Sequence, residues 1–228
     1  MSTLASVTIY DLFTNRPSAG IPGRLFFASD TGAGYYDDGS TWHQIVSVPG
    51  LMLLEEHTAS SSSELDFTTC FTSAYDDYDI RIVDLVVGTA GATIELQCST
   101  NGGSSYDTGS NYAWAVLYGT SGGGSGINNA DSDTAIQLRN SGGSGAPGNP
   151  VPLVAAMSVQ GPLSAAAYKS FHGTLNAPAQ ADVGSGHYAD ICALSGVYKS
   201  TTAVNAFRLL PSTGNFASGT VRVYGRTK

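Results

Sequence analysis

Charged residues are scarce in this chain. Asp, Glu, Lys and Arg make up 12% of its 228 residues, against about 25% in an ordinary soluble domain. Gly, Ser, Thr, Asn and Ala take their place, a composition that suits tight turns and surfaces covered by other protein chains. The hydrophobic content of 42% is still enough to build a core. The length fits one large all-β domain, or a small domain with a medium one.

Positive charge is the scarcer sign, and the formal net charge is −8. Because binding to phosphates requires a cationic stripe, we expect no nucleic-acid partner. Residues 1–150 hold 16 acids against 4 bases (−12), whereas residues 151–228 hold 2 acids against 6 bases (+4). This asymmetry suits oppositely charged faces that meet between subunits; solvated faces that arose by chance are the alternative.

Cysteines are few, and long apolar runs are missing. Cys70, Cys98 and Cys192 are widely spaced and form no CxxC or Cys/His cluster. We therefore expect buried, reduced thiols rather than a zinc site or a disulfide framework. No stretch approaches the ~20 apolar residues of a membrane span, and the N-terminus lacks the pattern of a signal peptide. We expect neither membrane insertion nor export by the usual route.

Helical periodicity is nearly absent, whereas strand signals bounded by Gly, Asn, Asp and Ser recur about every ten residues. The pattern predicts strands over Tyr78–Gly88, Ala92–Ser99, Ala203–Leu209 and Thr220–Tyr224. Only Leu163–Tyr168 resembles a helix, and it is too short for more than one turn. The predicted fold class is all-β: an antiparallel, jelly-roll-like β-sandwich.

A change of pattern around Pro49 divides the chain. Residues 1–48 carry short strand signals separated by Gly-containing turns, which predict a small N-terminal β-meander. So few short strands bury too little surface to be stable alone, so we expect the meander to pack on the larger domain or on other copies. Residues 51–228 are expected to form the sandwich, with flexible Gly-rich loops at 119–126 and 140–150.

Several segments resemble known proteins. Gly23–Ile45 (GRLFFASDTGAGYYDDGSTWHQI) resembles a short module common in tail fibres and other structural proteins of tailed bacteriophages. YDDYDI (75–80), STNGGSSYDTG (99–109) and GNFASGTVRVYG (214–225) resemble parts of a β-sandwich family of phage virion proteins. The resemblance implies a non-enzymatic structural protein, made in the bacterial host cytoplasm and located in the virion.

This resemblance implies a surface component of tail-fibre or spike type that contacts a host glycan or protein. A capsid decoration protein that clamps neighbouring capsomers is the alternative, and the absence of a repeat for a long shaft favours it. A carbohydrate-active depolymerase is more distant, since it would need a carboxylate pair on a groove. The expected partners are other virion proteins and the chain itself, as a homotrimer.

Aromatic residues mark the candidate contact surfaces, because aromatics anchor protein interfaces. The candidates for an assembly interface, all in the meander, are Phe26, Phe27, Tyr35, Tyr36 and Trp42. The candidates for receptor recognition, which flank the first Gly-rich loop, are Tyr106, Tyr112, Trp114 and Tyr118. The strand spacing of this second set suits the core or a subunit interface better.

Matches to catalytic motifs lack the context that they require. Gly119–Gly123 fits GxSxG, but no helix follows to form a nucleophile elbow. Gly143–Gly148 fits GxGxxG, but Pro147 and Pro150 prevent the helix whose N-terminus would hold a pyrophosphate. We predict no catalytic residue and no cofactor.

One acidic cluster is a candidate ion site. Asp76, Asp77 and Asp79 could bind Ca²⁺, but EF-hand spacing is absent and Asp also stabilises turns, so no metal is predicted. Glu56 and His57 point to opposite faces of a strand and form no acid–base couple. The histidines, none paired at ligand spacing, are His43, His57, His172 and His187.

Overall fold

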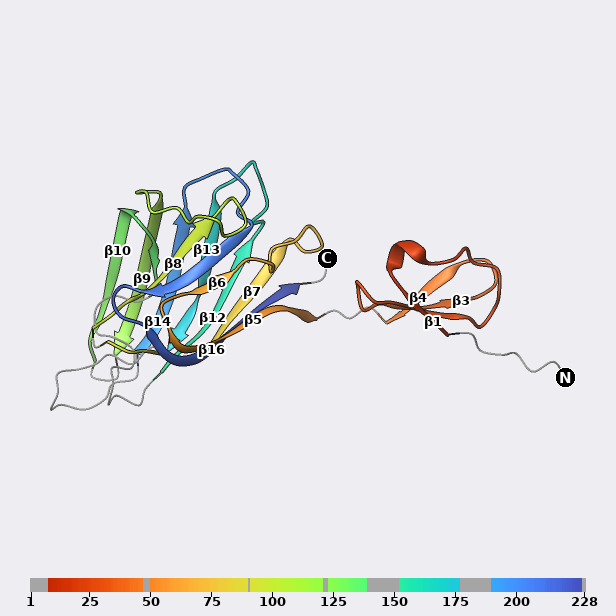
Figure 1. Ribbon diagram of the computed structural model, residues 1–228, viewed down its shortest axis with the longest axis horizontal. Coiled ribbons are helices and arrows are strands. Elements are labelled where there is room, and N and C mark those ends of the chain that lie inside the picture. Colours follow the sequence, from red (N-terminus) through yellow and green to blue (C-terminus); the bar gives the residue numbers. More distant parts are fainter. Residues whose placement is uncertain are drawn as a thin grey trace. The chain divides into compact units, whose positions relative to one another are not determined.

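The computed structural model describes residues 8–46, 50–89, 91–120, 123–138, 152–176 and 190–226. The regular elements in these ranges are sixteen β-strands and one 3-10 turn, η1 (Phe13–Asn15), which confirms the all-β class. No helix in the described ranges is long and apolar enough to cross a membrane. Contacts divide the chain into two units, Met1–Gly50 and Leu51–Lys228 (Figure 1).

The small unit is a four-stranded sheet in the order β1-β2-β3-β4. Its strands are β1 (Thr8–Asp11), β2 (Leu25–Ala28), β3 (Gly34–Asp37) and β4 (Trp42–Val46). The antiparallel strands β2 to β4 form the meander that the turn signals predict. β1 was not predicted, and it adds to the edge of β2 in parallel.

The larger unit consists of two antiparallel sheets, one of eight strands and one of four, which confirms the predicted sandwich. The eight-stranded sheet contains, in spatial order, β10 (Ser125–Asp133), β9 (Tyr112–Thr120), β14 (Asp190–Tyr198), β13 (Lys169–Asn176), β12 (Leu153–Gln160), β7 (Asp77–Val87), β16 (Phe216–Arg226) and β5 (Leu51–Ser62). The four-stranded sheet contains β11 (Ile136–Gln137), β8 (Ile94–Ser99), β15 (Ala206–Pro211) and β6 (Leu65–Phe67).

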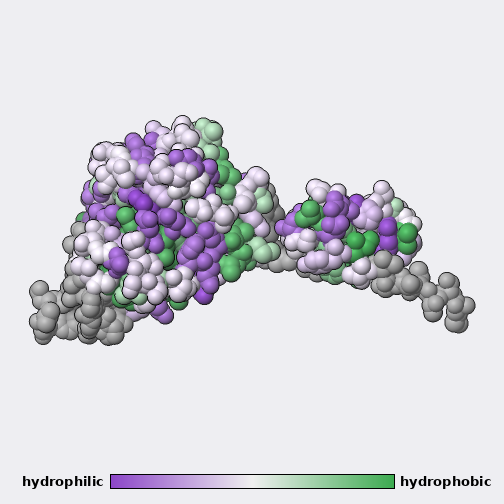
Figure 2. Space-filling model, viewed as in Figure 1, coloured by the Kyte–Doolittle hydropathy of each residue, from purple (hydrophilic) through white to green (hydrophobic). Residues whose placement is uncertain are grey.

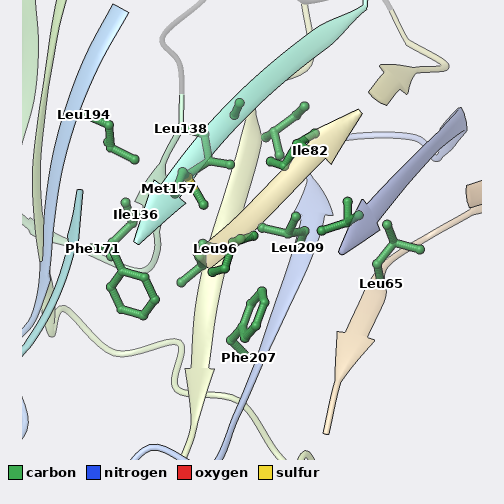
Figure 3. Packing of buried hydrophobic residues seen from close by; sticks show 14 of the residues in the cluster. Leu65, Ile82, Leu96, Ile136, Leu138, Met157, Phe171, Leu194, Phe207 and Leu209 are labelled. Carbon is green, nitrogen blue, oxygen red and sulfur yellow. The ribbon is translucent and has the colours of Figure 1, made fainter. Parts of the chain in front are cut away.

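The core lies between these two sheets. Successive side chains of a strand point to opposite faces, so one residue in two faces the other sheet. In β12, for example, Leu153, Ala155, Met157 and Val159 are buried, while the residues between them are not. Figure 3 shows side chains from both sheets, such as Met157 and Leu209, gathered in one cluster. The three cysteines are buried and form no disulfide.

The stretch Leu163–Tyr168 forms turns and bends rather than a helix. It lies in the loop between β12 and β13. A hydrogen bond fixes the start of this loop, because the Val204 amide donates to the Pro162 carbonyl oxygen at 2.8 Å. The predicted loop at 119–126 is shorter than expected, because β9 continues to Thr120 and β10 begins at Ser125.

Candidate interaction surfaces and ionisable sites

The interior of the small unit is built on Phe26. Its side chain is fully buried, and its ring lies 6.4 Å from that of Tyr35 and 6.1 Å from that of Trp42. The Trp42 indole N–H donates to the Pro17 carbonyl oxygen at 2.7 Å. Phe26 therefore belongs to the core of the unit, and its assignment to an assembly interface is corrected.

A buried ion pair completes this interior. The Asp37 carboxylate is inaccessible to solvent, and the Arg24 guanidinium donates to it at 2.6 Å. The backbone N–H groups of Gly20, Ile21 and Gly39 donate to the same carboxylate at 2.8–3.2 Å. Burial alone raises the pKa of Asp37, but Arg24 and the backbone donors outweigh it and lower the pKa to about 2.

The surface of the small unit exposes several large apolar side chains. They are Tyr10, Leu12, Phe13, Ile21, Tyr36 and Ile45. In Figure 2, hydrophobic residues (green) lie among hydrophilic ones (purple) on this unit. Of the predicted interface residues, only Tyr36 is exposed, at 42%, whereas Phe27, Tyr35 and Trp42 are half-buried. The candidate assembly interface of the small unit therefore retains Tyr36 and loses Phe26. The other exposed apolar residues of the unit are added to it.

Two of the receptor candidates are core residues. Tyr112 is fully buried; its hydroxyl donates to the Asp107 carbonyl oxygen at 3.0 Å and accepts from the Cys98 amide at 2.9 Å. Trp114 is 7% exposed, and its indole N–H donates to the Asp133 carboxylate at 2.9 Å. Neither ring can reach a receptor, which removes both from that set and agrees with the preferred core interpretation.

The other two receptor candidates are half-buried. The Tyr106 ring lies against the Arg208 guanidinium, whose central carbon is 4.4 Å from the ring centroid. Tyr118 packs against the hydrophobic core from β9. The structure does not bring these two tyrosines together with Tyr112 and Trp114 on an exposed surface.

The three aspartates of the acidic cluster at the start of β7 differ in burial. Asp79 is buried, and its two oxygens each lie 3.1 Å from Nη2 of Arg226. Asp79 also accepts from the Ser158 hydroxyl at 2.7 Å. Asp77 is half-buried and Asp76 is exposed. Among the residues described, no three His, Cys, Asp or Glu side chains are grouped so that they could hold a metal ion.

His57 pairs with the carboxylate of Glu55 rather than with that of the adjacent Glu56. Glu55 lies on the same face of β5, and its carboxylate is 2.9 Å from Nε2 of His57. Burial raises the pKa of Glu55. Hydrogen bonds from His57 and from the Thr68 and Thr69 amides outweigh this effect, so the net shift of the pKa is downward. Burial and the Glu55 carboxylate raise the pKa of the Cys70 thiol, which keeps it protonated and poorly nucleophilic.

Some motif residues lie outside the described ranges. They are Ser121 and Gly122 of the GxSxG match, the whole GxGxxG match at 143–148, and His187.

Comparison of the chain with protein-family models, curated proteins and solved structures finds no match. The function therefore has to be argued from the residues and surfaces described above.

Proposed function

We propose that this chain is a non-enzymatic structural protein of a tailed-bacteriophage virion, displayed on the particle as a tail-fibre or spike component. One observation carries the proposal. The segment Gly23–Ile45, which resembles a phage structural module, lies in a separate unit that leaves Tyr10, Ile21, Tyr36 and Ile45 in water. Exposed apolar side chains on so small a unit suit a surface that another protein covers.

The two units suggest a division of labour. The small unit attaches the protein to other virion proteins, and the sandwich of residues 51–228 is the displayed part, available to a glycan or protein of the host. The proposed assembly is a homotrimer, because closed cyclic symmetry is the usual way for copies to cover their apolar faces.

A capsid decoration protein is the second candidate. The observation that favours it is that two β units account for the described residues, and that these residues contain no repeat to supply the shaft of a fibre. In this role the same small unit would bind the capsid, and the sandwich would clamp neighbouring capsomers.

A depolymerase would need two carboxylates that face a substrate groove. Glu95 and Asp133 are one pair to consider, since the pKa of Glu95 is raised by burial and then by the charge of Asp133. Asp133, however, accepts from the Trp114 indole at 2.9 Å and from the Thr134 amide at 2.7 Å. These bonds give Asp133 a structural role, so we rank the enzyme last.

The proposal is tested by locating the protein on the particle. Antibodies raised against the purified protein, labelled with gold and applied to particles of the phage that encodes it, are expected to mark the tail in electron micrographs. Labelling at regular capsid positions would select the decoration role instead. Particles that contain the protein in neither place would overturn the structural role, and antibody preadsorbed with the protein is the control.

A further inference from the structure

Exposed apolar side chains in the larger unit gather on one face. Eight large hydrophobic residues are exposed in its described part. Seven of them lie on the outer face of the eight-stranded sheet, which is the face turned away from the four-stranded sheet. They are Leu51, Leu53, Val83, Leu117, Ile127, Val154 and Ile191. The eighth, Tyr168, lies in a loop.

The strand register places several of these residues side by side. Ile127 of β10 is opposite Leu117 of β9, which is opposite Ala193 of β14. Ile191, which is 76% exposed, lies two residues from Ala193 on the same face. Because neighbouring strands are about 4.8 Å apart, these side chains are within contact distance and form one apolar patch. Val154 of β12 lies on the same face, with Asn176 of β13 between it and Ile191.

The centre of this outer face carries no formal charge. On β9, β14, β13 and β12, none of the described residues that point outward is Asp, Glu, Lys or Arg. Many are small: Ala113, Ala115, Ala156, Ser158, Ser170, Thr174, Ala193 and Ser195. The polar side chains of His172, Asn176 and Gln160 lie on the same face. Small side chains on four adjacent strands make a flat surface onto which another sheet can pack closely.

Charged side chains on the remaining strands of the face largely offset one another. The outward side chains of β7, β16 and β5 include three arginines and three carboxylates: Arg81, Arg222, Arg226, Glu56, Asp77 and Asp79. Arg222 pairs with Glu56, and Arg226 with Asp79. The same sheet carries two further exposed carboxylates, Asp84 of β7 and Asp131 of β10, so its net charge is small and negative, whereas the whole chain carries −8.

This low charge bears on which partner covers the face. Two copies of a chain with net charge −8 repel each other when their acidic surfaces meet, and a face of low charge reduces that cost. The outer face of the smaller sheet is polar by contrast, with Asp66, Glu95, Gln97 and Arg208. Eight strands of about eight residues cover about 1,000 Å², and a standard interface buries about 800 Å² per partner. The face is therefore large enough for an interface between copies of the chain.

We infer that the outer face of the eight-stranded sheet is the surface through which copies of this chain associate. The inference rests on the self-association included in the proposed function and names the surface responsible. It does not depend on the location of the protein in the virion, because it concerns the purified protein in solution.

The test is the oligomeric state of the full-length protein, measured by sedimentation velocity over a range of micromolar concentrations. The variant Ala193→Arg places a charge at the centre of the face, and it should weaken association at least about tenfold, because the charge would be buried without a partner. Leu117→Ser removes apolar area without adding charge and should weaken association less. Gln137→Arg, on the outer face of the smaller sheet, is the matched control and should associate like the wild type.

Circular dichroism of each variant should match that of the wild type, since all three positions lie on the surface of the sandwich. Wild-type association that survives both Ala193→Arg and Leu117→Ser would overturn the assignment of this face while leaving self-association intact. A monomeric wild type would overturn self-association itself and would leave the face to another protein or to the small unit. Either result leaves the location of the protein in the virion to the antibody experiment.

Discussion

Single buried charges hold irregular parts of both units in place. Lys169 is fully buried, and its ammonium donates to the carbonyl oxygens of Ser164 and Ala167, each at 2.6 Å. It thereby fixes the loop between β12 and β13, although burial lowers the pKa of Lys169. Asp37 has the same role in the small unit, where it gathers the backbone of Gly20 and Gly39 around Arg24. In both units the buried charge holds backbone that belongs to no strand.

The Asp37 pair predicts acid sensitivity of the small unit. The folded pKa of about 2 lies below the ordinary value of 3.8, so the stabilisation is complete above pH 3.8 and is lost as the pH falls through about 2. Asp37→Asn should destabilise the small unit at neutral pH and remove this part of the acid transition, because Arg24 is then left without its carboxylate. The NMR signal of the Trp42 indole, bonded to Pro17, reports the state of the unit.

Asp30→Asn is the control, because Asp30 is exposed on the same unit and the substitution makes the same change of charge. It should leave the acid transition of the Trp42 signal nearly unchanged. An Asp37→Asn protein whose Trp42 signal titrates like that of the wild type would show that the ion pair does not hold the unit together.

At the scale of elements, one bulge shapes the eight-stranded sheet. The register between β16 and β7 shifts on both sides of Ser218, next to Gly219, which has a φ of +122°. A Cβ atom at Gly219 would lie 2.5 Å from Cα of Leu85 and 2.7 Å from the carbonyl oxygen of Asp84. Asp84 itself has a positive φ of 52°. The two strands approach each other so closely here that only glycine fits.

Gly219→Ala should therefore lower the free energy of unfolding of the larger unit by about 2–3 kcal/mol, through backbone strain and the clash with β7. Urea unfolding at one fixed protein concentration measures the loss. Gly119→Ala is the matched control in the same sheet, since its Cβ would meet no atom within 4 Å. It should change the stability by less than about 1 kcal/mol. Equal losses in the two variants would contradict this account of the bulge.

The elements that sequence patterns predict are those with a buried face. The strand expected at Tyr78–Gly88 is β7, and the one expected at Ala92–Ser99 contains β8. Both strands are rich in buried hydrophobic residues, which makes them detectable in the sequence. The edge strands β1 and β10 contain no buried residue, and β5 contains one, Ala59. An edge strand with little buried surface has no hydrophobic alternation to detect, so β1 and β10 were not predicted, and of β5 only the stretch around Glu56 and His57 was treated as a strand.

The same limit applies to the candidate sites. Strand spacing favoured the core or a subunit interface for Tyr112 and Trp114, and their burial selects the core. The pairing of Arg24 with Asp37 joins residues 13 positions apart on neighbouring strands, a separation with no local signature. The outer face of the eight-stranded sheet likewise depends on strand order, which hydrophobic periodicity does not contain.

At the scale of the whole molecule, the two units have separate interiors. The large hydrophobic cluster contains residues only from Ala59 to Val223, and partly buried neighbours begin at Leu54. The small unit packs around Phe26 and the Asp37–Arg24 pair, and contacts divide the chain between Gly50 and Leu51. Removing one unit therefore takes no side chain from the hydrophobic cluster of the other.

Deletion of residues 1–48 should leave a soluble, folded sandwich that still associates with itself but does not join the particle. Circular dichroism and sedimentation velocity test the first two points, and co-sedimentation with particles that lack the protein tests the third. The full-length double variant Tyr36→Ser/Ile45→Ser should also lose attachment, because both side chains are exposed on the small unit. Tyr168→Ser, an exposed position of the larger unit, is the control and should attach normally.

Three outcomes of the deletion are distinct. A truncated chain that unfolds or aggregates would mean that the small unit covers the sandwich, as the alternative to an attachment role requires. A folded truncation that still binds particles would place attachment in residues 51–228 and contradict the proposed division of labour. A folded truncation that has become monomeric would mean that the small unit, rather than the outer face of the eight-stranded sheet, joins the copies, and Ala193→Arg should then have no effect on association in the full-length chain.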